Sequence, residues 1–142
     1  MTTPEPAPEA AGAAPDDAMA ELAGRLFDMA RNGDTASLAA YVDAGVPVNL
    51  TNGKGDTLLM LAAYHGHAEA VRALVERGAD VDRPNDRGQS PLAGAVFKGE
   101  DEVVRVLAAG GADPRSGHPT AVDTATMFGR EDLLAVLEPG PA

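Results

Sequence analysis

Residues 57–67 read TLLMLAAYHGH, and residues 90–100 read SPLAGAVFKGE. Both stretches begin with a hydroxyl residue, continue with aliphatic and small residues, and reach a glycine nine positions after the hydroxyl. The interval of 33 residues between them recurs in two sets of glycines: Gly33, Gly66 and Gly99, and Gly45, Gly78 and Gly111. A fixed period of this length predicts a stack of similar small units, each contacting only its neighbours.

Apolar residues keep the same period. After Gly111 the interval shortens to 30 residues, since Gly99 is matched by Gly129 and Ser90 by Thr120. The three missing residues fall between Gly111 and Thr120, which predicts a shortened loop before the last unit. The matching apolar positions are Leu26, Leu59 and Leu92; Leu38, Val71 and Val104; and Tyr41, Leu74 and Leu107.

Each unit has the marks of two short helices. Thr57, Ser90 and Thr120 stand where a helix N-cap would accept a bond from a free backbone N–H, and Pro91 suits the first helical position. A glycine then ends the first helix, because glycine adopts the left-handed backbone conformation without steric cost. Acidic residues open the second helix, where they favour the positive end of its dipole. A Gly-Ala-Asp turn follows.

These motifs resemble the ankyrin-repeat family. The segments that begin at Thr57 and Ser90 resemble the family's T-P-L-H-x-A signature, although Met60 and Ala93 replace its histidine. Gly66-His67 resembles the Gly-His that joins the two helices of a repeat, and Arg77-Gly-Ala-Asp-Val-Asp resembles the turn that ends it. The resemblance implies an all-α ankyrin-repeat solenoid of about four helix-turn-helix repeats with short β-hairpin loops.

The resemblance covers about Ala20 to Leu137 and sets the expected domain organisation. We expect residues 1–17, rich in Pro, Ala and acid, to be a disordered tail, residues 18–138 to be the repeat domain and residues 139–142 to be a short tail. The first repeat has Gly24-Arg25 in place of a hydroxyl start, as is typical of a capping repeat. The expected repeats are residues 20–49 (N-terminal cap), 50–82, 83–114 and 115–138 (C-terminal cap).

Composition restricts the function classes. The formal net charge is −11, of which residues 1–17 supply four negative charges, and an acidic chain of this kind argues against binding nucleic-acid phosphates or an anionic membrane. No run approaches the roughly 18 apolar residues of a membrane span, and residues 1–17 lack the basic and apolar regions of a signal peptide. With no cysteine, a cytoplasmic location is expected. Nine Arg against two Lys suggest a bacterial source.

The sequence offers no catalytic constellation. Ser37, Ser90 and Ser116 are the only serines, and none lies in a nucleophile motif. His65 and His67 are two positions apart across a helix end, so their side chains should diverge rather than share a metal ion. His67 resembles the family's structural histidine. We therefore expect a protein that is not an enzyme and has no metal or cofactor.

A partner is expected at the concave face, which the family builds from hairpin tips and the exposed ends of the first helices. Three of the five aromatic residues and both lysines fall in this region, a pattern typical of interface hot spots. The alternatives are that Tyr64 and Phe97 simply pack together along the stack, and that the hairpin charges are only solvated. The candidate partner-binding residues are Tyr64, His65, Phe97, Lys98, Met127, Phe128, Lys54, Asp56, Arg87 and Gln89.

The sequence therefore predicts a monomeric, non-catalytic scaffold or regulator that binds a cytoplasmic protein with an apolar and partly acidic patch. Two other classes stay open. One is an enzyme or small-ligand binder that uses a cleft on the concave face. The other is a nucleic-acid-associated factor that contacts phosphates through Arg31, Lys54, Arg87 and Lys98.

Overall fold

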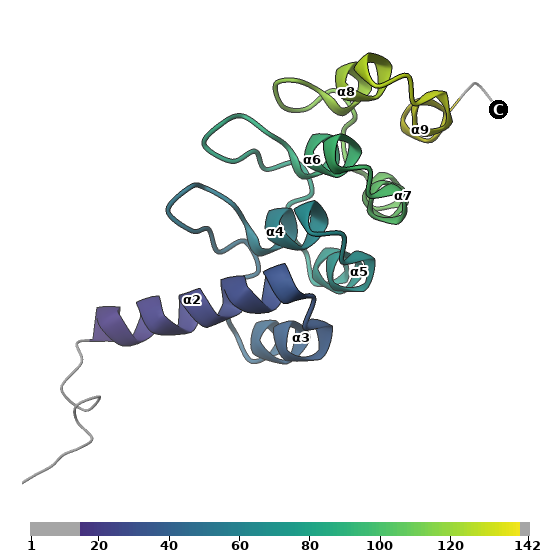
Figure 1. The fold of residues 1–142 in the computed structure, drawn as a ribbon. Coiled ribbons are helices and arrows are strands. Elements are labelled where there is room, and N and C mark those ends of the chain that lie inside the picture. Colours follow the sequence, from purple (N-terminus) through teal and green to yellow (C-terminus); the bar gives the residue numbers. More distant parts are fainter. Residues whose placement is uncertain (1–14, 140–142) are drawn as a thin grey trace, which may run out of the picture.

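The computed structural model describes residues 15–139, and within them the chain forms four helix pairs stacked side by side (Figure 1). The first helix of each pair packs on the first helices of its neighbours, and the second helices form an outer layer. The pairs are α2 (Pro15–Asn32) with α3 (Thr35–Asp43), α4 (Leu58–Tyr64) with α5 (Ala68–Glu76), α6 (Pro91–Lys98) with α7 (Asp101–Ala109), and α8 (Ala121–Met127) with α9 (Glu131–Leu137).

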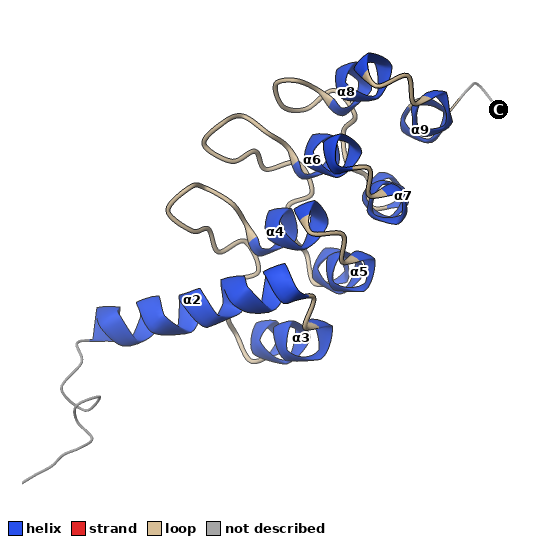
Figure 2. Ribbon diagram, in the orientation of Figure 1, coloured by secondary structure: helices blue, strands red, loops and turns tan. Residues whose placement is uncertain are grey.

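The all-α repeat architecture predicted from the sequence is confirmed. The loops that join successive pairs project to the same side of the stack (Figure 2), and in residues 15–139 they contain only one β-bridge, the antiparallel pair Thr51 and Thr57. The next loop keeps a similar turn without a bridge, since the Asn85 N–H donates to the Gln89 carbonyl at 3.0 Å. The loops are therefore hairpin-like turns rather than paired strands.

The predicted caps are present. Thr57, Ser90 and Thr120 precede α4, α6 and α8, and each hydroxyl accepts a bond from a backbone N–H three residues later, at 3.0, 3.1 and 3.0 Å. Pro91 occupies the first position of α6, where its missing N–H costs nothing. Gly99 caps the other end of α6 with a φ of 73°. Local chemistry thus sets both ends of the short inner helices.

The core lies between the two helix layers and runs the length of the stack. Residues 58–63 of α4 and 91–96 of α6 are buried, because each of these helices lies between two neighbouring first helices and its own partner. Alanines 62, 63, 95, 121 and 125 have no exposed surface. Such small side chains let neighbouring helices approach closely, while the leucines fill the remaining space.

The first helix is longer than the repeat period predicts. It begins at Pro15, so it includes three residues that the sequence analysis assigned to the tail; the rest of the predicted disordered tail, residues 1–14, lies outside the described residues. Residues 15–25 contain no Ser or Thr that could cap a helix at the repeat position, and the Ala- and Leu-containing segment 18–23 favours continued helix. Proline is also well suited to a helix start.

Backbone-to-side-chain bonds join each repeat to the next along the stack. The Asp80 N–H donates to Asn49 Oδ1 at 2.8 Å, and one repeat later the Asp113 N–H donates to Asp82 Oδ1 at 2.7 Å. On the outer side, the Arg77 guanidinium donates to both carboxylate oxygens of Asp43, at 2.9 and 3.2 Å. These repeated bonds fix the spacing of neighbouring turns.

Core leucines should contribute strongly to stability. Leu74 and Leu92 are 0% and 1% exposed, so we expect Leu74→Ala or Leu92→Ala to lower the free energy of unfolding by about 2–5 kcal/mol, through lost burial and the cavity left behind. Chemical denaturation measures the loss. Leu134→Ala, at a half-buried position of the terminal helix α9, is the control and should cost less. A loss below about 1 kcal/mol for both core variants would contradict their place in the core.

Gly33 and Gly99 have nearly the same backbone conformation, with φ of 74° and 73°, but different surroundings. A Cβ at Gly33 would lie 2.5 Å from the His67 ring, whereas a Cβ at Gly99 would meet nothing within 4 Å. His67 is held there because its Nε2–H donates to the Arg31 carbonyl at 2.7 Å, which agrees with its expected structural role.

Gly33→Ala should therefore destabilise the fold more than Gly99→Ala. Each substitution should lower the free energy of unfolding by about 1–2 kcal/mol, because alanine disfavours the left-handed conformation. Gly33→Ala should lower it by about 1 kcal/mol more, because it displaces the His67 hydrogen bond. Thermal or chemical unfolding measures the difference. The double variant Gly33→Ala/His67→Ala should remove the steric part, and equal losses for the two glycine variants would contradict the packing of His67 on Gly33.

Candidate functional site

The ends of the first helices form one row along the stack. Tyr64 is the last residue of α4, Lys98 the last residue of α6 and Met127 the last residue of α8. Tyr64, Phe97 and Met127 line two hollows together with residues of the projecting loops, so these side chains face the side of the stack from which the loops project. We call this side the concave face.

An apolar hollow of about 340 Å³ opens on the concave face between α4, α6 and α8. Its walls include three of the most exposed large apolar side chains in residues 15–139: Phe97 is 55% exposed, Met127 68% and Phe128 48%. The rings of Phe97 and Phe128 pack together with centroids 5.7 Å apart. The lining residues are Tyr64, Arg87, Gln89, Ala93, Phe97, His118, Pro119, Thr124, Met127 and Phe128.

A second, more polar hollow of about 410 Å³ adjoins the first on its N-terminal side. The two share Tyr64, Arg87 and Gln89, so a single ligand can occupy both. The lining residues of this polar hollow are Arg31, Asn52, Gly53, Lys54, Asp56, Met60, Leu61, Tyr64, His65, Arg87 and Gln89. Nine of the ten candidate partner-binding residues thus line the two hollows.

The tenth candidate, Lys98, lies beside them. Its ammonium is 4.9 Å from the centroid of the Tyr64 ring, a cation–π geometry, and the Tyr64 ring in turn meets His65 edge-on at 5.8 Å. Among the described residues Phe97 is paired with Phe128 rather than with Tyr64. The alternative prediction, that Tyr64 and Phe97 simply pack against each other along the stack, therefore does not describe the main aromatic contact of this face.

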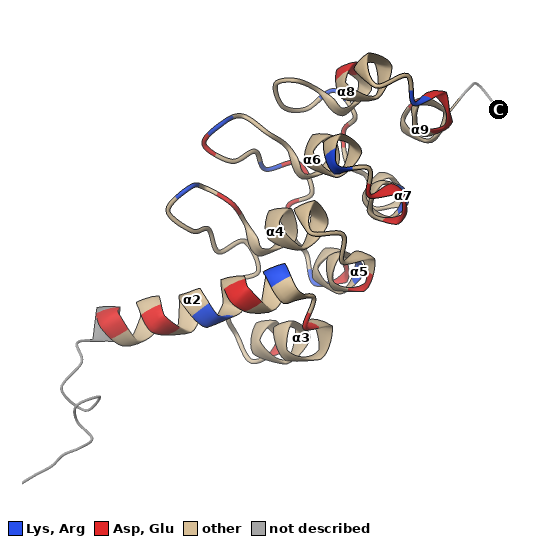
Figure 3. Ribbon diagram, in the orientation of Figure 1, with Lys and Arg blue, Asp and Glu red and all other residues tan. Residues whose placement is uncertain are grey.

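Three of the positive charges on this face have no acidic partner within the described part of the chain. Among residues 15–139, Lys54, Arg87 and Lys98 form no ion pair with a carboxylate. The loops after α3 and α5 carry both basic and acidic segments (Figure 3), but the carboxylate of Asp56 accepts a bond from Asn85 Nδ2 at 2.9 Å. The paired cations are Arg31, Arg72, Arg77, Arg105, Arg115 and Arg130.

The family model for ankyrin repeats (3 copies) matches residues 26–118 of the chain. The chain belongs to the ankyrin-repeat family. It is also similar to a Pseudomonas aeruginosa protein named "Putative ankyrin repeat protein PA3287", with 53% identity over 49 residues, which are 34% of this chain and 29% of that protein. The match therefore spans less than a third of that relative's length. Ankyrin repeats are generally protein-interaction modules and typically have no catalytic role.

Within this ankyrin stack, His65 lies in a positively charged setting. Partial burial lowers the pKa of His65 below its usual 6.5, and the nearby His67, Lys98 and Arg31 lower it further. The imidazole is therefore neutral at neutral pH. It contributes a hydrogen-bonding group to the polar hollow rather than a permanent charge.

Several lining residues were missed by the sequence reasoning. Met60 and Ala93 lie three positions after the caps of α4 and α6, so the repeat register could have identified them. His118 and Pro119 lie in the shortened loop, where the register is interrupted. The His118 N–H donates to the Gly88 carbonyl at 2.8 Å, and this bond fixes the loop against the preceding turn in a way that the repeat pattern does not predict.

The described residues contain no group of three or more His, Cys, Asp or Glu side chains that could hold a metal ion. In the same part of the chain, no helix has the length and apolar character needed to cross a membrane.

The lowered pKa of His65 predicts a measurable dependence on pH. The His65 resonances should titrate below pH 6.5 by NMR, and Lys98→Met should move the pKa upward, because it removes a nearby cation. Since the unfolded chain binds this proton more readily than the folded chain, protonation of His65 should reduce stability as the pH falls below 6.5. A His65 pKa at or above 6.5 would contradict this description of the face.

Proposed function

We propose that this ankyrin-repeat protein is a non-catalytic interaction module that binds a cytoplasmic partner protein through its concave face. The observation that carries the proposal is the clustering of Phe97, Met127 and Phe128 around one hollow, since these are three of the four exposed large apolar residues in residues 15–139. Contiguous exposed apolar surface of this kind marks interaction sites.

The composition of the face supports a protein partner. Interface hot spots are enriched in aromatic and Arg side chains within a rim that excludes water, and here Phe97, Phe128 and Tyr64 adjoin Arg87 and Lys98. These three aromatic side chains do not belong to the buried core, which consists of Leu, Val and Ala residues together with Phe27. The surplus of acid over base in the chain disfavours a nucleic acid as the partner.

A small ligand is the second candidate. The apolar hollow, at about 340 Å³, lies within the roughly 300–1,000 Å³ that is typical of small-molecule sites. A bound metabolite would stabilise the fold in proportion to its concentration. Thermal unfolding with a metabolite library therefore distinguishes this candidate from a protein-binding role.

The double variant Phe97→Ala/Met127→Ala tests the proposed function. Both side chains are largely exposed, so the fold should remain intact by circular dichroism while affinity for the native partner falls at least tenfold, or about 1.4 kcal/mol. The measurement is quantitative pull-down from the native lysate, with the captured protein identified by mass spectrometry.

The matched control is Met19→Ala, which removes a side chain of similar exposure, 61%, from α2, away from both hollows. It should recover the same partner as the unmodified chain. Equal partner recovery by Phe97→Ala/Met127→Ala and Met19→Ala would refute binding through the concave face.

A further inference from the structure

We infer that the partner presents one continuous segment in which a bulky apolar side chain is followed or preceded, within a few residues, by a carboxylate. The apolar side chain occupies the apolar hollow, and the carboxylate binds Lys54 and Arg87 at the polar hollow. This inference rests on the proposed function and specifies the partner's chemistry.

The apolar half of the site favours one large side chain. Tyr64, Phe97, Met127 and Phe128 border the hollow, and Ala93 belongs to its lining. Removing such apolar walls from water together with an aromatic or branched aliphatic side chain is favourable in proportion to the area covered. The hollow can therefore anchor a large apolar side chain, but it selects little among side chains of that kind.

The charged side chains determine which chemical class of partner the site selects. Acidic residues outnumber basic residues by 22 to 11 in the chain, yet Lys54 and Arg87 have no carboxylate partner among residues 15–139. Asp56, the one acid that lines the polar hollow, is bonded to Asn85. Asp56 keeps its negative charge in this bond, but Lys54, Arg87 and Arg31 outnumber it in the lining of the polar hollow. A ligand carboxylate therefore meets two cations, Lys54 and Arg87, that form no ion pair within the described part of the chain.

Both cations lie on rigid turns. The Lys54 N–H donates to Asn52 Oδ1 at 2.9 Å and the Arg87 N–H donates to Asn85 Oδ1 at 3.0 Å. The two turns are joined because the Asp86 N–H donates to the Lys54 carbonyl at 3.0 Å. A fixed backbone reduces the entropy lost when the side chains bind a carboxylate.

Arg87 connects the two halves, because it lines both hollows together with Tyr64 and Gln89. A carboxylate bound to Arg87 is therefore close to a side chain in the apolar hollow, and both groups can come from neighbouring positions of one segment. The protein's own residues 2–14 do not fit this description. They contain Glu5 and Glu9 but no aromatic or large aliphatic side chain, and Met1, just before them, is four positions from Glu5.

The test is selection of a phage-displayed random dodecapeptide library on the immobilised full chain. Enriched peptides should combine an aromatic, Leu or Met residue with an Asp or Glu within about three positions. Against Lys54→Glu/Arg87→Glu their affinity should fall at least about tenfold, as expected when a charge pair becomes repulsive. Raising salt from about 0.05 M to about 0.5 M should weaken binding to the unmodified chain but not to this variant.

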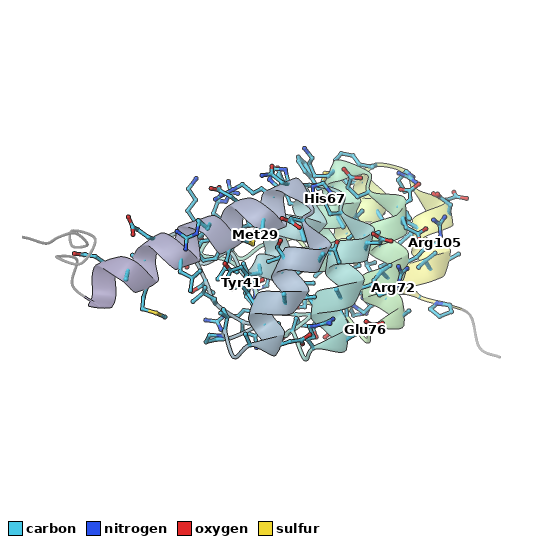
Figure 4. The ribbon with its side chains drawn as sticks, turned by 90° about the horizontal axis from the view of Figure 1, so that it is seen from below. Met29, Tyr41, His67, Arg72, Glu76 and Arg105 are labelled. Atoms are coloured by element: carbon cyan, nitrogen blue, oxygen red, sulfur yellow. The ribbon has the colours of Figure 1, made fainter. Side chains whose placement is uncertain are left out.

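The matched control is Arg72→Glu/Arg105→Glu, which makes the same change in net charge on the outer helices α5 and α7 (Figure 4). It should leave peptide affinity within about threefold, because neither side chain lines the two hollows. The fold should also persist, because exposed ion pairs contribute little to stability. Equal weakening by both variants would show a net-charge effect and overturn the inference.

Other outcomes of these experiments would also support or overturn the inference. Enrichment of peptides without acid, or no enrichment, would exclude an acidic segment as the occupant. Self-association abolished by Lys54→Glu/Arg87→Glu would assign the face to a second copy and overturn the inference. If Phe97→Ala/Met127→Ala releases the native partner but Lys54→Glu/Arg87→Glu does not, the proposed function stands and only the inference fails. If neither variant affects recovery of the native partner, the concave-face function fails as well.

Discussion

A helix of seven to nine residues cannot bury its apolar surface alone, and the rest of this structure depends on that constraint. Helices α4 and α6 are enclosed only because each packs against a first helix on either side and its own partner behind. Isolated helices of this length are marginal in water, so tertiary burial provides most of their stability. Each repeat is stable only when it is stacked on its neighbours. The buried positions must therefore recur at the same interval along the chain.

The same constraint places the candidate site. Close stacking of the first helices needs small residues, and Ala62, Ala95 and Ala125 occupy equivalent buried positions with no exposed surface. Large side chains are then accommodated at the helix ends, on the side of the projecting loops. Phe97, Met127 and Phe128 are exposed there, at 55%, 68% and 48%. The geometry that builds the core therefore also aligns a row of large side chains.

Sequence reasoning succeeded where local chemistry decides the structure. Ser90 and Pro91 start a helix and Gly99 ends it for reasons contained in a few neighbouring residues, and the structure confirms them. Sequence reasoning failed for segments that depart from the repeat period. Helix α2 begins at Pro15, ahead of the repeat register, and His118 reaches the apolar hollow from a loop that departs from the repeat length.

The sequence also could not predict which charged side chains form ion pairs. The register placed Lys54, Arg87 and Lys98 on the concave face. It gave no indication that they form no ion pair among residues 15–139, because pairing depends on side-chain positions between repeats. Arg77 illustrates the difference: it reaches Asp43 in the preceding repeat, although 34 residues separate them. In the outer layer Arg72, Arg77 and Arg105 pair with acids, whereas Lys54, Arg87 and Lys98 of the concave face form no ion pair among residues 15–139. In an acidic chain, cations that have no acidic partner among the described residues, placed beside an exposed aromatic cluster, favour a partner that offers both apolar surface and negative charge.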